Sequence, residues 1–184
     1  MSVPEGVQER YSLARLTTVR TGGEADYFAR PESAEEVVAL LAWAEAENLP
    51  VGVVGSGSNL LVADEGFRGL VIKLDGHLTQ STFEGDGVIA GGGMRLPSLA
   101  SKAAGEGLAG LEFGVNIPGT VGGAIRMNAN AYGGELASVL EWAEVATPAG
   151  VHTRTPEDFE FSYRHSNITG YEVVTRAQFQ LQSA

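Results

Sequence analysis

A glycine- and serine-rich pentapeptide directly after an apolar run has the composition of an anion-binding loop. It consists of Gly55, Ser56, Gly57, Ser58 and Asn59 and follows Val51–Val54. Glycines let successive backbone N–H groups turn toward one ligand, and a diphosphate can approach a main chain that carries no side chains. The loop lacks the Gly-Lys-Ser/Thr ending of a Walker loop, and Leu60–Val62 favours a strand over the helix of a dinucleotide fingerprint. An ordinary glycine-rich turn is the alternative for this pentapeptide alone.

A second candidate region covers residues 114–134 and is rich in Gly, Pro and Asn. Pro118 before Gly119 predicts an entry turn, and the residues after it could begin a helix whose N-terminus faces an anion. The alternative is an ordered surface loop. Irregular segments of this length in compact domains are usually functional, so we favour a ligand-binding role.

The third candidate is Phe161–Ser166, in which Tyr163 precedes Arg164. An arginine in such a segment can hold a carboxylate through two hydrogen bonds or stabilise a developing oxyanion. A surface arginine paired with an acid is the simpler interpretation of these residues alone. The three histidines His77, His152 and His165 are widely separated. They show no metal-ligand spacing, so no metal site is predicted.

Composition limits the ligands and the class of protein. The chain has 184 residues with 12 Lys+Arg and 23 Asp+Glu, for a net charge of −11. This balance argues against nucleic acid, and an anionic ligand must be held mainly by backbone N–H groups and a few arginines. Zero cysteines exclude disulfides, thiol catalysis and Cys-ligated metals. The polar N-terminus and short apolar stretches predict a soluble cytoplasmic protein without a membrane partner.

The elements that must position these residues form two lobes. Residues 31–50 predict a helix, with Ser33 as the N-cap and Glu36 completing a capping box. Strands are predicted at 51–54, 60–62 and 70–74. Together they make a first α/β lobe over residues 17–75, preceded by an N-terminal extension over 1–16.

The second lobe is assigned to residues 76–184. Strands are predicted at 88–90 and 139–147, with a helix between them that begins near Leu96 and ends at Gly105. Alternating apolar and polar residues over 171–181 predict a half-buried strand. The fold class that follows is α+β, with α/β character in the lobes.

Taken in order, the motifs resemble the flavin-binding part of the UDP-N-acetylenolpyruvoylglucosamine reductase (MurB) family, from about residue 10 to the end. The segments that carry the resemblance are Thr17–Gly23, Gly55–Leu61, Ile117–Ala124, Asn128–Gly133 and Phe161–Ser166. Any one of them is a weak signal. Five in the family's order and spacing are a strong one.

The resemblance implies a two-lobed FAD-binding domain of the p-cresol methylhydroxylase type. The family reduces FAD with NADPH and passes hydride to UDP-N-acetylglucosamine enolpyruvate, which yields UDP-N-acetylmuramate for peptidoglycan. Carried over by position, Arg164 would steady the substrate carboxylate and the enolate-like charge, and Tyr163 would line the same pocket. The implied FAD contacts are Gly55, Ser56, Gly57, Ser58, Asn59, Leu60, Ile117, Pro118, Gly119, Thr120, Gly122, Gly123, Ala124, Asn128 and Ala129.

The resemblance stops at the C-terminus. The family continues into a substrate-binding domain that brings a proton-donating serine and an assisting glutamate. We expect that domain to be absent here and this chain to be a truncated or incomplete form. Two alternatives remain open: a non-catalytic FAD-binding module, and an oxidase of the same flavoprotein superfamily. No feature of the sequence predicts an oligomeric state.

Overall fold

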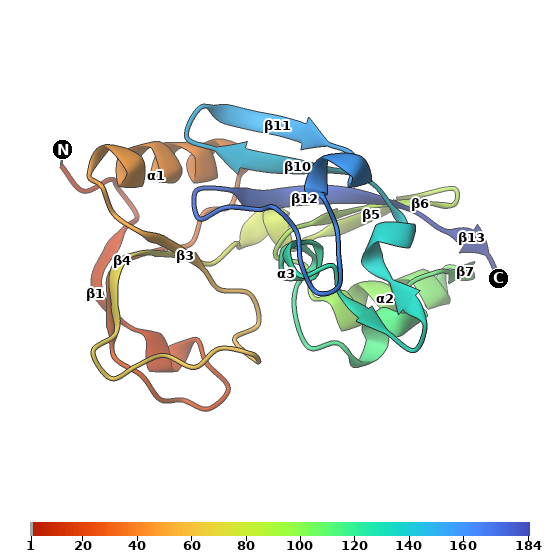
Figure 1. Ribbon diagram of the computed structural model, residues 1–184, viewed down its shortest axis with the longest axis horizontal. Helices are drawn as coiled ribbons and strands as arrows, with labels where there is room; N and C mark the ends of the chain where they lie inside the picture. The colour runs from red at the N-terminus through yellow and green to blue at the C-terminus, as the bar shows by residue number, and fades with distance from the viewer. Residues whose placement is uncertain (1) are drawn as a thin grey trace.

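Two sheets with different pairing patterns organise the chain in the computed structural model, which describes residues 2–184 (Figure 1). The first has the order β1-β2-β4-β3 and the second the order β11-β10-β12-β6-β5. Two further ladders, β7 with β13 and β8 with β9, contain two strands each. The chain passes from the first sheet to the second between β4 and β5. The predicted α+β class with two lobes is therefore confirmed.

The first sheet contains β1 (Gln8–Ser12), β2 (Glu24–Ala29), β3 (Val51–Val53) and β4 (Phe67–Ile72). Strands β2 and β3 run parallel to β4, and β1 pairs with β2 in the antiparallel sense. The first two strands lie in segments for which no strand was predicted, and β1 belongs to the segment expected as an extension.

The strand predicted at 60–62 is wrong. These residues form no ladder, because they lie alongside the loop before β2, where Gly23 N–H donates to the Ala63 carbonyl at 2.9 Å.

Helix α1 (Ala34–Ala46) begins where the sequence predicts. The Ser33 hydroxyl accepts from the Glu36 N–H at 3.2 Å, as an N-cap does. The Glu36 carboxylate accepts from the Glu32 N–H at 2.7 Å. The reciprocal half of the predicted capping box is therefore wrong, because this carboxylate reaches the amide one residue before the cap.

Side chains of the first sheet alternate between two apolar layers. Leu70 and Ile72 of β4 pack with α1, whereas Val71 between them faces the other side, where it joins Phe28. That second layer is covered by Leu13 and Leu16, in and just after the 3-10 helix η1 (Leu13–Arg15). The period of two expected for a strand thus buries both faces of this sheet.

The second sheet is antiparallel throughout. Its strands are β5 (Ser81–Glu84), β6 (Gly87–Gly91), β10 (Leu140–Thr147), β11 (Gly150–Arg154) and β12 (Val173–Gln180). The strands predicted at 88–90, 139–147 and 171–181 are confirmed. Central strand β12 buries Thr175, Ala177 and Phe179, as its alternation predicts.

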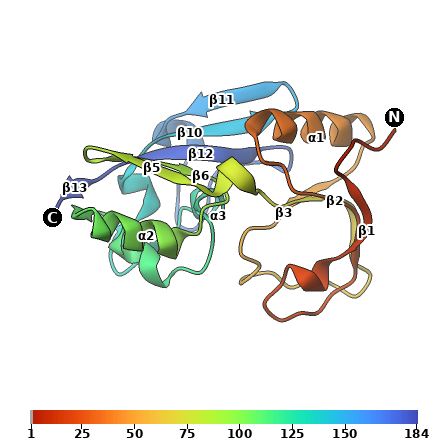
Figure 2. The ribbon, with the colours of Figure 1, turned by 180° about the vertical axis from the view of Figure 1, so that it is seen from behind.

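Helices α2 (Leu96–Gly105) and α3 (Val121–Arg126) lie on the same side of this sheet in both ribbon views (Figures 1 and 2). Helix α3 begins three residues after Pro118, so the predicted helix start is confirmed. The remaining elements are η2 (Gly76–Thr79), β7 (Leu108–Ala109), η3 (Glu112–Asn116), β8 (Asn130–Ala131), β9 (Gly134–Glu135), η4 (Leu136–Ser138), η5 (Pro156–Phe159) and β13 (Gln182–Ser183).

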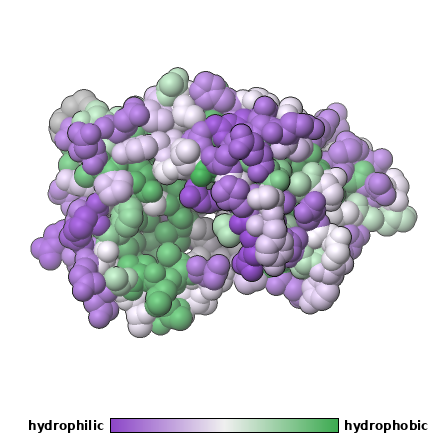
Figure 3. Space-filling model, viewed as in Figure 1, coloured by the Kyte–Doolittle hydropathy of each residue, from purple (hydrophilic) through white to green (hydrophobic). Residues whose placement is uncertain are grey.

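The lobes share part of their core. Ala146 of β10 and Val173 of β12 are buried in the same apolar cluster as Val37 and Leu41 of α1. The space-filling view shows apolar surface on the first lobe, next to the hollow between the lobes (Figure 3). Over residues 2–184, no helix combines the length and apolarity required to cross a bilayer.

Candidate functional site

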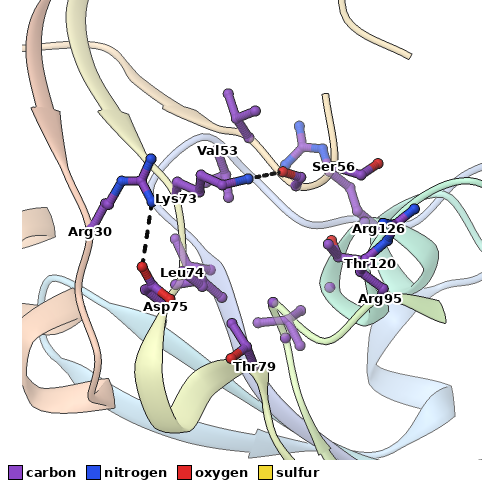
Figure 4. A pocket seen from close by; sticks show the side chains of 18 of the residues that line it. Arg30, Val53, Ser56, Lys73, Leu74, Asp75, Thr79, Arg95, Thr120 and Arg126 are labelled. Carbon is purple, nitrogen blue, oxygen red and sulfur yellow. Dashed lines mark hydrogen bonds and ion pairs between the residues drawn. The ribbon is translucent and has the colours of Figure 1, made fainter. Parts of the chain in front are cut away.

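A cavity of about 580 Å³ lies between the two lobes. The first lobe contributes the ends of β3 and β4 and the loop after β3, and the second contributes the turn after β6, the start of α3 and the start of β12. Figure 4 shows Arg30 and Lys73 on one side of the cavity and Thr120, Arg95 and Arg126 on the other. Its volume is in the range of sites for cofactors and other small molecules.

The loop after β3 meets this cavity through Gly55, Ser56 and Ser58. Gly57 lies behind them with φ +69°, and a Cβ on it would lie 1.7 Å from the Leu16 carbonyl oxygen. Its own carbonyl accepts from the backbone N–H and the hydroxyl of Thr18, at 3.1 and 2.9 Å. Close packing against the preceding loop therefore requires glycine here and fixes the course of residues 55–58.

The second predicted segment meets the cavity through Thr120, Gly122 and Gly123. It also contacts the first loop directly. The Ser58 hydroxyl donates to the Pro118 carbonyl at 3.0 Å, and a Cβ on Gly55 would lie 2.6 Å from the Thr120 Oγ1. Ser58 and Pro118 are 60 residues apart in the sequence. The two glycine-rich segments thus form one continuous wall.

The other residues expected to contact the cofactor do not line this cavity. They are Gly57, Asn59, Leu60, Ile117, Pro118, Gly119, Ala124, Asn128 and Ala129. Asn128 is 3% exposed, and its side chain is engaged with the protein, donating to the Ser162 carbonyl and accepting from the Ala137 N–H. Cofactor contacts at these positions stay predictions.

At Gly123 the cavity is bounded by backbone atoms, because this residue has no side chain. Apart from its chain neighbours and the backbone of its own helix, a Cβ on this residue would meet one atom within 4 Å, the Thr120 Oγ1 at 3.5 Å. Protein packing therefore does not require glycine here, in contrast to Gly57. The space that a side chain would take is left to the cavity, which fits a ligand that approaches the main chain.

Six charged side chains reach the cavity: Arg30, Lys73, Arg95, Arg126, Asp75 and Glu172. Four of the 12 cations in this acidic chain thus meet two carboxylates at one place. Sequence reasoning missed them because they lie near the ends of separate elements. Each cation is unremarkable in its own stretch of sequence, and only the folded arrangement brings them together.

Lys73 follows β4 and lies closest to the first loop. Its Nζ donates to the Gly55 carbonyl at 2.6 Å. Burial lowers the pKa of this amine, and the neighbouring Arg30 lowers it further. Arg30 itself pairs with Asp75 at 3.5 Å. An anion in the cavity would offset the repulsion between these cations.

Glu172 also lines the cavity, just before β12. Its carboxylate accepts from the Thr169 N–H at 2.7 Å and pairs with Arg154. Burial alone would raise the pKa of this carboxyl group, but the hydrogen bonds from Thr169 and Arg154, together with the arginine charge, lower it. Glu172 is therefore a fixed negative group in the cavity wall.

Tyr163 and Arg164 lie elsewhere, at the tip of a tight turn closed by two backbone hydrogen bonds between Ser162 and His165. Tyr163 is 80% exposed, and Arg164 is exposed with φ +54°. Within the part of the chain that is described, the Arg164 guanidinium has no hydrogen bond or ion pair. The structure does not bring either side chain into the lining of the 580 Å³ cavity.

Comparison with protein families identifies the class of domain. Residues 25–155 match the family described as FAD binding domain. The chain belongs to the FAD binding domain family. This assignment agrees with a cavity that offers backbone-level walls and clustered cations, the features that a dinucleotide requires.

This FAD-binding domain is homologous to part of several reductases, so the resemblance seen in the sequence motifs is confirmed. It is 44% identical to UDP-N-acetylenolpyruvoylglucosamine reductase of Lactiplantibacillus plantarum over 96% of this chain and 59% of the relative. For the Levilactobacillus brevis reductase the identity is 47%, over 92% and 56%. The crystal structure of the Thermus caldophilus reductase (MurB) superposes with a TM-score of 0.82 at 39% identity, over 95% and 62%. The chain thus spans about 60% of the length of these relatives.

More distant structures share the fold. Alkyldihydroxyacetonephosphate synthase superposes with a TM-score of 0.66 at 17% identity. For 6-hydroxy-D-nicotine oxidase of Arthrobacter nicotinovorans the TM-score is 0.68 at 19% identity. Both comparisons cover the whole of this chain. At these identities the likeness shows a common two-lobed architecture and nothing about the reaction.

Proposed function

We propose that the cavity between the lobes holds FAD. Gly55, Ser56 and Ser58 would hold its diphosphate, with Lys73 as the nearest cation. Thr120, Gly122 and Gly123 would contact another part of the cofactor. The four clustered cations and the backbone-level wall at Gly123 support this placement. Bound FAD would supply hydride transfer, and the protein supplies orientation and charge.

We further infer that the chain is the FAD-binding part of a reductase acting on UDP-N-acetylglucosamine enolpyruvate, with NADPH as the hydride donor and UDP-N-acetylmuramate as the product. The observation that carries this inference is the 44–47% identity to enzymes named for that substrate. Such a reaction would belong to peptidoglycan synthesis in the cytoplasm, where NADPH and nucleotide sugars are available.

Arg164 would act on the substrate in this scheme. A free guanidinium on an exposed turn is available to hold the enolpyruvyl carboxylate and to stabilise the negative charge that develops beside it. Tyr163 at the same turn would cover the bound substrate. The absence of any competing carboxylate partner for Arg164 among residues 2–184 supports this role.

A non-catalytic FAD-binding module is the second candidate, because residues 25–155 match an FAD binding domain and Tyr163 and Arg164 lie outside the cavity lining. An oxidase of the same superfamily receives less support, because the oxidase relative is 19% identical. The reductase and the module differ in whether the flavin, once reduced, can be reoxidised by the enolpyruvyl nucleotide.

Titration with FAD, followed by anaerobic reduction, tests the proposal. The purified chain should take up FAD and show flavin absorbance at about 450 nm. NADPH should then bleach that absorbance, and the enolpyruvyl nucleotide should restore it. Bleaching without recovery would favour the non-catalytic module, and a chain that takes up no FAD would contradict the whole proposal.

The Arg164→Ala variant separates substrate chemistry from cofactor binding. We expect it to leave FAD affinity unchanged and to slow reoxidation by the nucleotide about a hundredfold, as the loss of an oxyanion-stabilising group does. Arg20→Ala is the matched control, because Arg20 is also exposed with φ +54°. Loss of FAD from Arg164→Ala would show that the role assigned to Arg164 is wrong.

A further inference from the structure

One side of the turn that carries Tyr163 and Arg164 is anchored by Asn128. This asparagine is 3% exposed. Its Nδ2 donates to the Ser162 carbonyl at 3.2 Å, and its Oδ1 accepts from the Ala137 N–H at 3.2 Å. The amide thus links the base of the turn to the segment after β9, using both its donor and its acceptor.

The other side of the turn is anchored by Ser166. This serine is 6% exposed, and its hydroxyl donates to the carbonyl of Arg126, the last residue of α3, at 2.6 Å. Carbonyls in the last turn of a helix have no partner inside the helix. Ser166 satisfies one of them and ties the chain just after the turn to α3.

The turn needs such anchors because its backbone is held in an uncommon conformation. Arg164 has φ +54°, a region that side chains other than Gly, Asn and Asp rarely adopt. Its side chain makes no hydrogen bond or ion pair within residues 2–184. The conformation of the tip therefore depends on the residues at its base.

Helix α3 connects these anchors to the cavity. Gly122 and Gly123 in its first turn and Arg126 at its end line the cavity. The Arg126 carbonyl and Asn128, two residues beyond the helix, hold the turn. A helix of this length spans about 9 Å. Figure 1 shows the loop between η5 and β12 passing beside α3. One short rigid element thus sets the place of the turn relative to the cavity.

We infer that Asn128 and Ser166 are positioning residues that hold Arg164 in register with the cofactor cavity through α3. The inference rests on the proposed function only for what Arg164 does once it is placed. It assigns Asn128 a role different from the cofactor contact that the family resemblance implies.

Limited trypsin digestion of the full chain tests the anchoring itself. Cleavage after Arg164 requires the turn to open, so its rate reports on local stability. We expect Asn128→Gly and Ser166→Ala each to raise this rate about two- to tenfold, the effect of losing one hydrogen bond. Glycine tolerates the φ of +40° at position 128, so this variant removes the amide without backbone strain. Ser101→Ala is the control, since its hydroxyl also donates to a backbone carbonyl, of Pro97 at 3.0 Å.

Spectroscopy of the FAD-loaded chain tests positioning. The Ser166→Ala variant should bind FAD with unchanged affinity, and both variants should need about two- to tenfold more enolpyruvyl nucleotide than the wild type to perturb the flavin spectrum. If the nucleotide does not perturb the flavin spectrum of the wild type, the proposed function is wrong. The digestion result would still show whether Asn128 and Ser166 hold the turn. Weaker FAD binding with unchanged cleavage after Arg164 would overturn the inference.

Hydrogen exchange in the wild type needs no variant. The Ser162 and His165 amides, which close the turn, should exchange at least tenfold more slowly than in an unstructured peptide. Exchange at the unprotected rate would overturn the inference, even if the variants failed to fold.

Discussion

The cavity and the Arg164 turn are built in opposite ways. In the cavity, the two glycine-rich segments pack against each other and against neighbouring backbone, with Gly57 beneath the Leu16 carbonyl and Ser58 bonded to Pro118. The turn projects from the protein and is held at its base by two side chains. The proposed cofactor site is thus fixed by packing, whereas the proposed substrate contact depends on a few hydrogen bonds.

This difference predicts two classes of substitution. Changes around the cavity should alter folding or cofactor affinity, because its walls also hold the lobes together. Changes at the turn should alter the reaction and leave folding almost untouched. The effects of four substitutions around the cavity test this expectation.

The largest effect is expected for Gly57→Ala. The added Cβ would lie 1.7 Å from the Leu16 carbonyl oxygen at a φ of +69°, so the backbone must move. We expect a loss of about 3 kcal/mol in the free energy of unfolding, measured by urea denaturation. Gly119→Ala is the control, because no atom lies within 4 Å of a Cβ there. Equal stability of the two variants would contradict the packing assigned to the first loop.

Lys73→Met should come next. It removes both a cation from the cavity and the 2.6 Å bond to the Gly55 carbonyl. We expect the Kd for FAD to rise about thirtyfold, in line with the loss of a hydrogen bond to a charged group. Lys102→Met provides the comparison, since Lys102 lies on α2 outside the cavity lining. Isothermal titration calorimetry would measure the Kd for FAD of both variants. An equal rise in both would show that FAD affinity depends on net charge rather than on the position of Lys73.

Gly123→Ala should weaken FAD binding without destabilising the protein. Its Cβ would fill cavity space while meeting one protein atom at 3.5 Å. We expect about tenfold lower FAD affinity and an unfolding free energy equal to or up to about 1 kcal/mol above wild type, because alanine favours the helix. Gly105→Ala at the end of α2 is the helical control. Unchanged FAD affinity would place the cofactor away from this wall.

Glu172→Gln should show a small effect that depends on pH. The folded-state pKa of Glu172 is lowered from its ordinary value of 4.5, so its ionised form stabilises the fold above that pH. The variant should lose about 1 kcal/mol at neutral pH, a value reduced by solvent screening. The difference should shrink as the pH falls below 4.5 and disappear below the folded-state pKa. Thermal melts from pH 7 to 3 would test this, with exposed Glu84→Gln as the control.

The sequence predicted best those elements whose pattern reflects their burial. The 13-residue helix α1 carries an apolar face directly after its cap Ser33, and β12 alternates from Thr175 to its end. Strands β1 and β2 were missed because their signal lies in pairing with each other and with β4, which local sequence does not show. Leu60–Val62 looked like a strand but has no strand partner.

In the candidate site, the two glycine-rich segments could be recognised from the sequence, but the four cations that line the cavity could not. The two segments reach the same cavity, as their composition suggested, through Gly55, Ser56, Ser58, Thr120, Gly122 and Gly123. Arg30, Lys73, Arg95 and Arg126 lie at the ends of different elements, and each becomes a site residue through tertiary packing alone. The motif around Arg164 was visible, but its strained turn and the anchors beneath it depend on contacts across 34 to 40 residues of chain.

The cavity between the lobes has a consequence for the life of the protein in the cell. A ligand that contacts both walls binds the folded chain and has no comparable site on the unfolded one. At a hundredfold excess over its Kd, FAD would add about 2.7 kcal/mol to the unfolding free energy, or about 5–10 °C in Tm. Flavin supply would then regulate the abundance of this protein, since chains made without FAD would be the first that proteases remove.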